Sequence, residues 1–170
     1  DDAVRLTQMC IRDLDLDPKR FPPRTVHGLI SQAKNEVIDA AEYRARVSNI
    51  HERKVGEVYV EYQRRLHAAS AMDFDDLLLQ TVRLLRQEPD VLGNYQRRFR
   101  HVLVDEYQDT NKAQNEIVLN IGAGHGNVTV VGDGDQSIYK FRGADLRNIT
   151  EFETAFPDTT VVVLDQNYRS

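Results

Sequence analysis

Residues 1–72 place apolar side chains at helical spacing. Apolar residues recur at steps of three and four between Val26 and Val37, and again between Val55 and Leu66. This is the period of an amphipathic helix. A shorter set covers Leu6 to Cys10, and no alternating pattern of strand length occurs in this part of the chain. We therefore expect a small all-helical unit, with polar and mobile chain around residues 44–54.

The pattern changes after Ala71. Asp73 can cap a helix that ends at Glu88-Pro89, because proline disfavours helical geometry in the residue before it. A short helix over residues 91–98 follows. Three apolar runs rich in valine come next, and they lack alternation, which is typical of strands buried on both faces. The runs are His101–Val104, Val128–Val131 and Thr160–Leu164.

The spacing of the three runs favours a parallel sheet. Their last residues, Val104, Val131 and Leu164, are 27 and 33 residues apart, and both intervals can hold a strand–helix–strand crossover. The intervening helices are predicted at 112–121 and 144–156. We therefore predict an α/β fold in which residues 73–170 form a partial parallel sheet with flanking helices, next to the helical unit of residues 1–72.

Charge supports this division. The chain has 22 basic and 27 acidic residues, a net charge of -5, and residues 1–72 hold 12 and 11 of them. The remaining 10 and 16 give residues 73–170 a net charge of -6. A general cationic coat for nucleic acid is excluded, although a local basic face is not. The single cysteine, Cys10, cannot form an internal disulfide, and this favours a reducing cytoplasm.

Basic residues are concentrated in one stretch of the helical unit. Residues 19–67 carry 10 basic and 6 acidic residues. Such cations could contact duplex phosphates, and a solvated helical face explains them equally well. The cations grouped near the expected mobile chain are Arg44, Arg46, Arg53, Lys54, Arg64 and Arg65. The five histidines show no close ligand spacing, so we expect no structural metal.

Each apolar run is followed by a polar cluster, as at the ligand-binding edge of an open parallel sheet. Asp105 and Glu106 follow the first run. Adjacent carboxylates at a strand end point in different directions, so one can hold a divalent cation while the other faces an attacking water. This division of work suits phosphoanhydride hydrolysis. The alternative is that Asp105 and Asp109 only cap the helix over residues 112–121.

The second and third clusters add further candidates. Gln136 can hydrogen-bond a terminal phosphate, and Arg169 can stabilise charge on a transferring phosphoryl group. Tyr139, Phe141 and Arg142 combine rings for stacking on bases with a cation for phosphates, as single-strand binding requires. The alternative for these aromatic residues is an ordinary place in the core.

Together these strings resemble superfamily 1 DNA helicases of the UvrD/PcrA/Rep family. The match is specific from about residue 71 onward, and residues 1–70 resemble the helical 1B insertion more by position than by motif. The matching segments are Ala71–Leu78, which resembles the re-entry into the first motor domain, Val104–Asn111 (motif II), Val131–Ala144 (motif III) and Leu164–Ser170 (motif IV).

The resemblance implies a role for each matched residue. Asp105 would bind Mg2+, Glu106 would be the catalytic base, and Gln136 would couple the γ-phosphate of ATP to the DNA path. Tyr168 would stack near the adenine and Arg169 would contact the γ-phosphate. The single-strand track would be lined by Tyr139, Phe141 and Arg142. Phe141 departs from the tryptophan usual in the family, and Gly134 from its aspartate or alanine.

The resemblance also implies a RecA-like 1A domain, ATP and Mg2+ as cofactors, and 3′-to-5′ movement on single-stranded DNA and at junctions with duplex DNA. A Gly-x-x-x-x-Gly-Lys-Thr/Ser loop is absent from the sequence. We therefore expect this chain to be an inactive half-site of a longer protein. That protein is expected in the bacterial cytoplasm, near the nucleoid rather than a membrane, in repair or replication restart and with possible repair partners. A subunit of a helicase–nuclease complex and a non-catalytic DNA- or protein-binding module remain alternatives.

Overall fold

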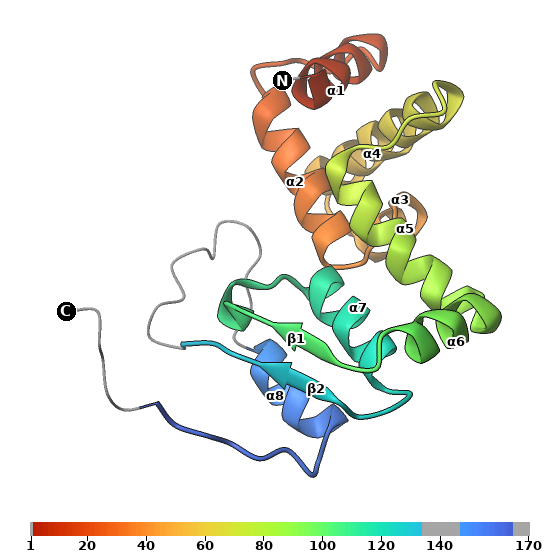
Figure 1. Ribbon diagram of the computed structural model, residues 1–170. Helices are drawn as coiled ribbons and strands as arrows, with labels where there is room; N and C mark the ends of the chain where they lie inside the picture. The colour runs from red at the N-terminus through yellow and green to blue at the C-terminus, as the bar shows by residue number, and fades with distance from the viewer. Residues whose placement is uncertain (1, 134–146, 165–170) are drawn as a thin grey trace.

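The computed structural model describes residues 2–133 and 147–164. Four helices form the first part of the chain and lie together at one end of the molecule (Figure 1). They are α1 (Asp2–Asp13), α2 (Pro23–Asn35), α3 (Ala40–Arg46) and α4 (Ile50–Ala68). The helices expected from the apolar spacing are therefore present. Their shared core is made by Cys10, Ile11, Phe21, Val26, Ile30, Ala33, Val55, Val58, Tyr59 and Tyr62.

The expectation of polar, mobile chain at residues 44–54 is wrong. Helix α3 runs through Arg46 and α4 begins at Ile50, so little of this segment lies outside a helix. The reason is local capping. The Asp39 carboxylate accepts a hydrogen bond from the Glu42 backbone N–H (2.8 Å), and the Asn49 side chain does the same for Glu52 (2.8 Å). These bonds satisfy helix donors that otherwise lack partners.

Two helices connect this part to the sheet. Helix α5 (Phe74–Gln87) begins after the Asp73 cap, whose carboxylate accepts from the Asp76 backbone N–H at 2.7 Å. Helix α6 (Pro89–Arg98) follows at once, because Pro89 occupies the first turn, where no intrahelical N–H is needed. Both helices were expected from the sequence. Leu79 and Val82 of α5 pack with Val37 and with Ala113 in a second, smaller apolar cluster.

The first two predicted strands are confirmed as a parallel pair. β1 (Val102–Val104) and β2 (Val128–Val130) pair in the register Val102 to Val128 and Val104 to Val130. Between them the chain forms the short 3-10 turn η1 (Tyr107–Asp109) and helix α7 (Lys112–Gly122). α8 (Arg147–Ala155) follows β2 within the expected 144–156, of which residues 144–146 lie outside the described part. The chain is thus an α/β protein, mostly helical, with a small parallel sheet.

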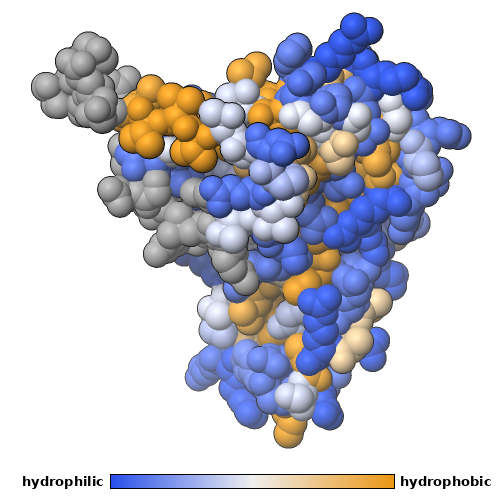
Figure 2. All heavy atoms as spheres, turned by 90° about the horizontal axis from the view of Figure 1, so that it is seen from below, coloured by the Kyte–Doolittle hydropathy of each residue, from blue (hydrophilic) through white to orange (hydrophobic). Residues whose placement is uncertain are grey.

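The third predicted strand is not formed. Residues 160–164 carry no strand assignment, and Val161–Leu164 are 70–84% exposed. In Figure 1 this blue segment runs past the sheet as irregular chain, and in Figure 2 an orange patch adjoins the grey atoms on the same side. A strand needs a neighbouring backbone to satisfy its amide and carbonyl groups. Within the described residues, no strand pairs with this segment.

The expectation that the strands are buried on both faces is also wrong. Leu103 is 78% exposed, whereas its neighbours Val102 and Val104 are partly buried. Side chains alternate between the two faces of a strand. Helices α7 and α8 cover one face: a Cβ added at Gly122 of α7 would lie 2.3 Å from Val128 Cγ2 and 3.0 Å from Phe156 Cζ. The face that carries Leu103 is open in the described structure.

Among the described residues, none of the helices is both long enough and apolar enough to cross a membrane.

Candidate functional site

Asp105 and Glu106 lie at the carboxyl end of β1, beside the end of β2. Two backbone hydrogen bonds tie these ends together, from Val131 N–H to the Val104 carbonyl (2.8 Å) and from Tyr107 N–H to the Val131 carbonyl (2.9 Å). Asp105, Glu106 and Asp133 are all exposed. Carboxylates that follow two neighbouring strands therefore face solvent at one edge of the sheet, where ligands bind in open parallel sheets.

Glu106 has a left-handed backbone, with φ 49° and ψ 42°. This conformation is uncommon for a residue other than glycine and costs about 1–2 kcal/mol. The Asp105 carboxylate accepts a hydrogen bond from the Glu106 backbone N–H at 2.9 Å, which stabilises the sharp turn. The turn brings the chain from β1 directly into η1, with Glu106 exposed at the turn.

Gln108 holds the Glu106 carboxylate in place. Its side chain is 1% exposed, and its Nε2 donates to Glu106 Oε2 at 2.7 Å. Its Oε1 accepts from the Asp133 backbone N–H at 2.9 Å. A Cβ at Gly132 would lie 2.8 Å from that same oxygen, so a larger residue there would displace the Gln108 side chain. Sequence reasoning gave Gln108 no role, and its only signal was its place in the motif II string.

The η1 turn is anchored by the buried side chain of Tyr107. Tyr107 is buried, and its hydroxyl donates to the Asn115 side chain of α7. Its ring packs edge-on against Phe152 of α8, with centroids 5.7 Å apart. Burial, with the Glu151 charge, raises the pKa of Tyr107 to about 12. The hydroxyl therefore stays protonated and keeps its donor role at neutral pH.

The capping interpretation of Asp105 and Asp109 does not hold. Asn111 is the cap of α7, and its side chain accepts from the Gln114 backbone N–H at 2.9 Å. The side-chain Oε1 of Gln114 in turn accepts a hydrogen bond from the Asn111 backbone N–H at 3.0 Å. Among the described residues, the buried Asp109 Oδ1 has no hydrogen-bond partner. Neither Asp105 nor Asp109 therefore caps α7, which was the alternative to a role in binding or catalysis.

The donor set at this edge suits Mg2+ held jointly with a nucleotide. Mg2+ usually takes one or two protein carboxylates and completes its shell with water and substrate phosphates. Asp105 and Glu106 are exposed oxygen donors of that kind. The described part of the chain contains no group of three or more His, Cys, Asp or Glu side chains that could hold a metal unaided. A cation here would depend on the phosphates as well as on Asp105.

The remaining predicted site residues lie outside the described residues. The segments concerned are 134–146 and 165–170. Their predicted roles therefore stay predictions. The residues are Gln136, Tyr139, Phe141, Arg142, Tyr168 and Arg169.

The six basic residues between residues 44 and 65 fall into two groups. Lys54 pairs with Glu57 at 2.8 Å, Arg64 with Glu61 at 2.7 Å, and Arg65 with both Glu61 and Asp13. The second group is exposed and makes no ion pair among the described residues: Arg44, Arg46 and Arg53. Contact of this second group with duplex phosphates stays a prediction.

Comparison with known proteins gives a consistent result. The UvrD/REP helicase N-terminal domain matches residues 1–157. The ATP-dependent DNA helicase UvrD1 of Mycobacterium tuberculosis (strain ATCC 25618 / H37Rv) is 52% identical over 100% of this chain and 23% of its own length. The ATP-dependent DNA helicase PcrA of Bacillus subtilis (strain 168) is 43% identical over 99% of this chain and 23% of its own. The chain spans about a quarter of the length of these relatives.

Proposed function

Because the chain belongs to the UvrD/REP helicase family, we propose that it supplies one half of the ATP-hydrolysing site of a longer DNA helicase. The observation that carries this proposal is the Glu106 carboxylate, exposed beyond β1 and held by the buried Gln108. A carboxylate fixed by a hydrogen bond and open to solvent can orient a water and accept its proton. The relatives named above are ATP-dependent DNA helicases.

In this proposal the two adjacent carboxylates have different tasks. Asp105 binds Mg2+, which when bound offsets phosphate charge. Glu106 orients the attacking water and takes its proton, and the Gln108 amide keeps one carboxylate oxygen engaged so that the other faces the water. Gln136 and Arg169 contact the γ-phosphate, and Tyr168 stacks near the adenine. Single-stranded DNA passes over Tyr139, Phe141 and Arg142.

We further propose that residues 1–72 are a helical 1B subdomain and that residues 73–170 are the C-terminal part of a RecA-like 1A motor domain. The parent would move 3′-to-5′ on single-stranded DNA and unwind junctions with duplex DNA. Its setting would be repair or replication restart in the bacterial cytoplasm, near the nucleoid. The parallel β1–β2 pair supports the assignment of a sheet domain, and the remaining statements rest on family membership alone.

The test of the base assignment is Glu106→Gln in the full-length helicase. We expect nucleotide binding to stay within about threefold, because the neutral amide keeps the shape of the side chain. DNA-stimulated ATP turnover should fall by about 10²–10⁴-fold, the usual contribution of a general base. Nucleotide affinity by fluorescence titration and steady-state phosphate release measure the two effects. Glu153→Gln, an exposed position on α8, is the matched control and should retain full turnover.

Wild-type turnover in the Glu106→Gln protein would contradict the base assignment. The 170-residue chain itself should hydrolyse no ATP, since no phosphate-binding loop is in its sequence. DNA-stimulated hydrolysis by this chain alone would refute the half-site proposal. A nuclease motif elsewhere in the full-length protein would favour a helicase–nuclease subunit. An inactive full-length protein that binds DNA would favour a binding module.

A further inference from the structure

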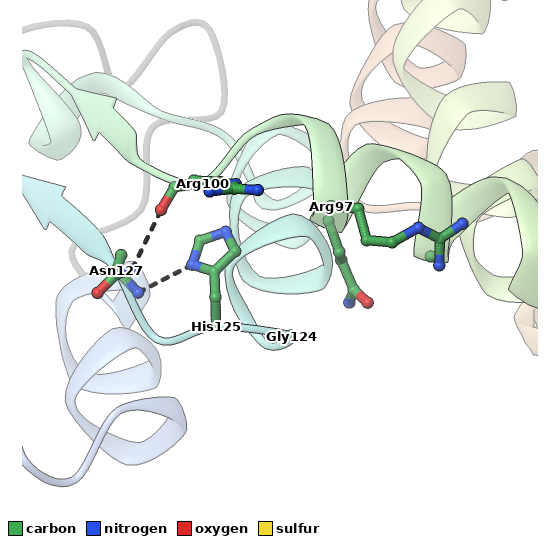
Figure 3. Close-up of a pocket in the computed structure, with 7 residues that line it drawn as sticks. Arg97, Arg100, Gly124, His125 and Asn127 are labelled. Carbon is green, nitrogen blue, oxygen red and sulfur yellow. Dashed lines mark hydrogen bonds between the residues drawn. The ribbon is translucent and has the colours of Figure 1, made fainter.

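A basic pocket lies at the opposite end of the sheet from Asp105 and Glu106. Its volume is about 480 Å³, and its lining includes Gln96, Arg97, Arg100, Gly124, His125 and Asn127 (Figure 3). Arg100 comes two residues before β1, and Asn127 comes directly before β2. The pocket therefore sits at the amino ends of the strands, between the end of α6 and the loop that follows α7. Figure 1 shows where these elements lie.

Specific contacts fix the shape of this pocket. A Cβ added at Gly124 would lie 2.7 Å from the Gln96 side chain, so the loop approaches α6 as closely as glycine allows. Gln96 Nε2 donates to the Asn120 carbonyl at 2.8 Å, and Asn127 Nδ2 donates to the Arg100 carbonyl at 3.2 Å. The backbone on both sides of the pocket is thus held by hydrogen bonds in the described structure.

The pocket contains donors that lack acceptors. His125 Nδ1 accepts a hydrogen bond from the Asn127 backbone N–H at 2.9 Å. The ring proton of the neutral imidazole therefore lies on Nε2, which becomes a donor. Nε2 is buried and has no partner among the described residues. A buried donor without an acceptor costs about 1–3 kcal/mol, so an acceptor that reached Nε2 by displacing the atoms that cover it would recover this free energy.

The two arginines add positive charge that no ion pair among the described residues neutralises. Arg97 donates to the neutral Asn94 side chain, and in the described part of the chain neither Arg97 nor Arg100 forms an ion pair. Neither aspartate nor glutamate is among the lining residues. Arginines in the last turn of α6 also interact favourably with the negative end of the helix dipole. That effect explains Arg97, but it does not explain Arg100 or the unsatisfied His125 donor.

We propose that this pocket binds a phosphate group of the DNA backbone. Arginine presents a planar fork of donors that matches phosphate, and the His125 N–H supplies a further donor. A tetrahedral phosphate offers oxygens in several directions to donors on different walls, whereas a planar carboxylate offers only two. The proposal goes beyond the ATP site, and its choice of DNA rests on the proposed function. It places a second DNA contact at the amino ends of the strands.

The first test measures binding of a fluorescent oligonucleotide, single-stranded and duplex in separate arms, to the 170-residue chain. The double variant Arg97→Gln/Arg100→Gln should bind at least about tenfold more weakly, and the slope of log K against log salt should fall by about one, because one phosphate contact is lost. Arg98→Gln is the matched control. Arg98 lies on the same helix and is not among the lining residues, and its guanidinium sits over the Phe99 ring at 5.8 Å. It should change affinity by less than threefold.

The second test reports on His125 directly. Dimethyl phosphate, the smallest phosphodiester, should shift the ¹⁵N resonance of His125 Nε2 and should no longer do so in the double variant. An equal loss of DNA binding in Arg98→Gln would overturn the pocket in favour of diffuse charge. Tighter binding of an oligoglutamate peptide than of DNA would overturn the phosphate assignment.

Far-ultraviolet circular dichroism is the control for folding, and each variant should keep the helical signal of the wild-type chain. Because Arg97 and Arg100 lie away from Asp105 and Glu106, failure here leaves the Glu106→Gln result unchanged, and failure there leaves the pocket result unchanged. The two proposals are thus separately testable.

Discussion

Lys34 is fully buried, and its ammonium group lies between two carboxylates. Its Nζ is 2.7 Å from Asp73 Oδ2 and 2.9 Å from Asp76 Oδ1. The Tyr62 hydroxyl donates to Asp73 at 2.8 Å, and the Tyr62 ring centroid is 5.1 Å from Nζ. Burial opposes ionisation of Asp73, but the hydrogen bond and charge of Lys34 outweigh it, so the pKa of Asp73 is lowered. This cluster joins α2 and α4 to the start of α5.

Replacing Lys34 by methionine should destabilise the fold strongly. The change keeps most of the side-chain volume but leaves Asp73 and Asp76 buried without their cation, which typically costs about 3–5 kcal/mol. Urea unfolding at pH 7 measures the free energy of unfolding. Lys54→Met is the control, since the Lys54–Glu57 pair is 40% exposed on both sides and should contribute less than about 1 kcal/mol. Equal midpoints for the two variants would contradict the structural role of Lys34.

At the level of elements, the packing of α7 against the sheet depends on a glycine. Gly122 is buried where α7 meets Val128 of β2 and Phe156 after α8. Gly28 of α2, by contrast, has nothing within 4 Å of an added Cβ. The two positions therefore offer the same substitution in a crowded and in an open helical site.

We expect Gly122→Ala and Gly28→Ala to have opposite effects on stability. Overpacking at Gly122 should destabilise by about 1–3 kcal/mol. Alanine at Gly28 should stabilise by about 0.5–1 kcal/mol, because glycine loses more backbone entropy in a helix. Thermal unfolding followed by circular dichroism measures both. An unchanged melting temperature in Gly122→Ala would mean that α7 and β2 are not in close contact.

The sequence was sufficient for the long helices and for the first two strands, because their apolar periodicity and spacing are local. Helix α3 was missed because its seven residues are too few to show a period. Its only signal was the cap Asp39, followed three residues later by Glu42. The run Val161–Leu164 has strand composition but no partner in the described chain, and composition cannot reveal a missing partner.

The candidate site was predictable in part. The position of Asp105 and Glu106 after a strand follows from the apolar run before them. The Gln108 bridge did not, because it depends on a backbone N–H of Asp133, 25 residues further along the chain. The basic pocket was equally hidden, since Arg97 and His125 come from segments that only the fold brings together.

At the scale of the whole molecule, two carboxylates with lowered pKa values make stability depend on pH: Asp73 in the Lys34 cluster and Glu61 on the surface. The pKa of Asp73 is lowered, and hydrogen bonds from Arg64 and Arg65 lower that of Glu61 to about 2. A carboxylate whose folded pKa lies below its unfolded value stabilises the fold while it is ionised. That contribution is complete above the unfolded pKa, about 4, and is lost as the pH falls through the folded pKa.

We therefore expect the melting temperature to be flat from pH 7 to 5 and to fall steadily from about pH 4 to pH 2. Added salt separates the contribution of the surface ion pair from that of the buried one. At 1 M NaCl the contribution of the exposed Arg64–Glu61 pair should be largely screened, whereas that of the buried Lys34–Asp73 pair should persist. Calorimetry at both salt concentrations measures this. A melting temperature that rises on acidification would contradict the lowered pKa values.

The parallel pairing of β1 and β2 also sets an order in time. Val102 and Val128 are partners in register although they lie 26 positions apart, with α7 between them. The contacts of α3 with α4 join near neighbours and require only short loops to close. Loop closure must precede any gain from distant pairing, which makes it the slower event. We therefore expect the α3–α4 pair to form early during folding, and the edge that carries Glu106 to be completed later.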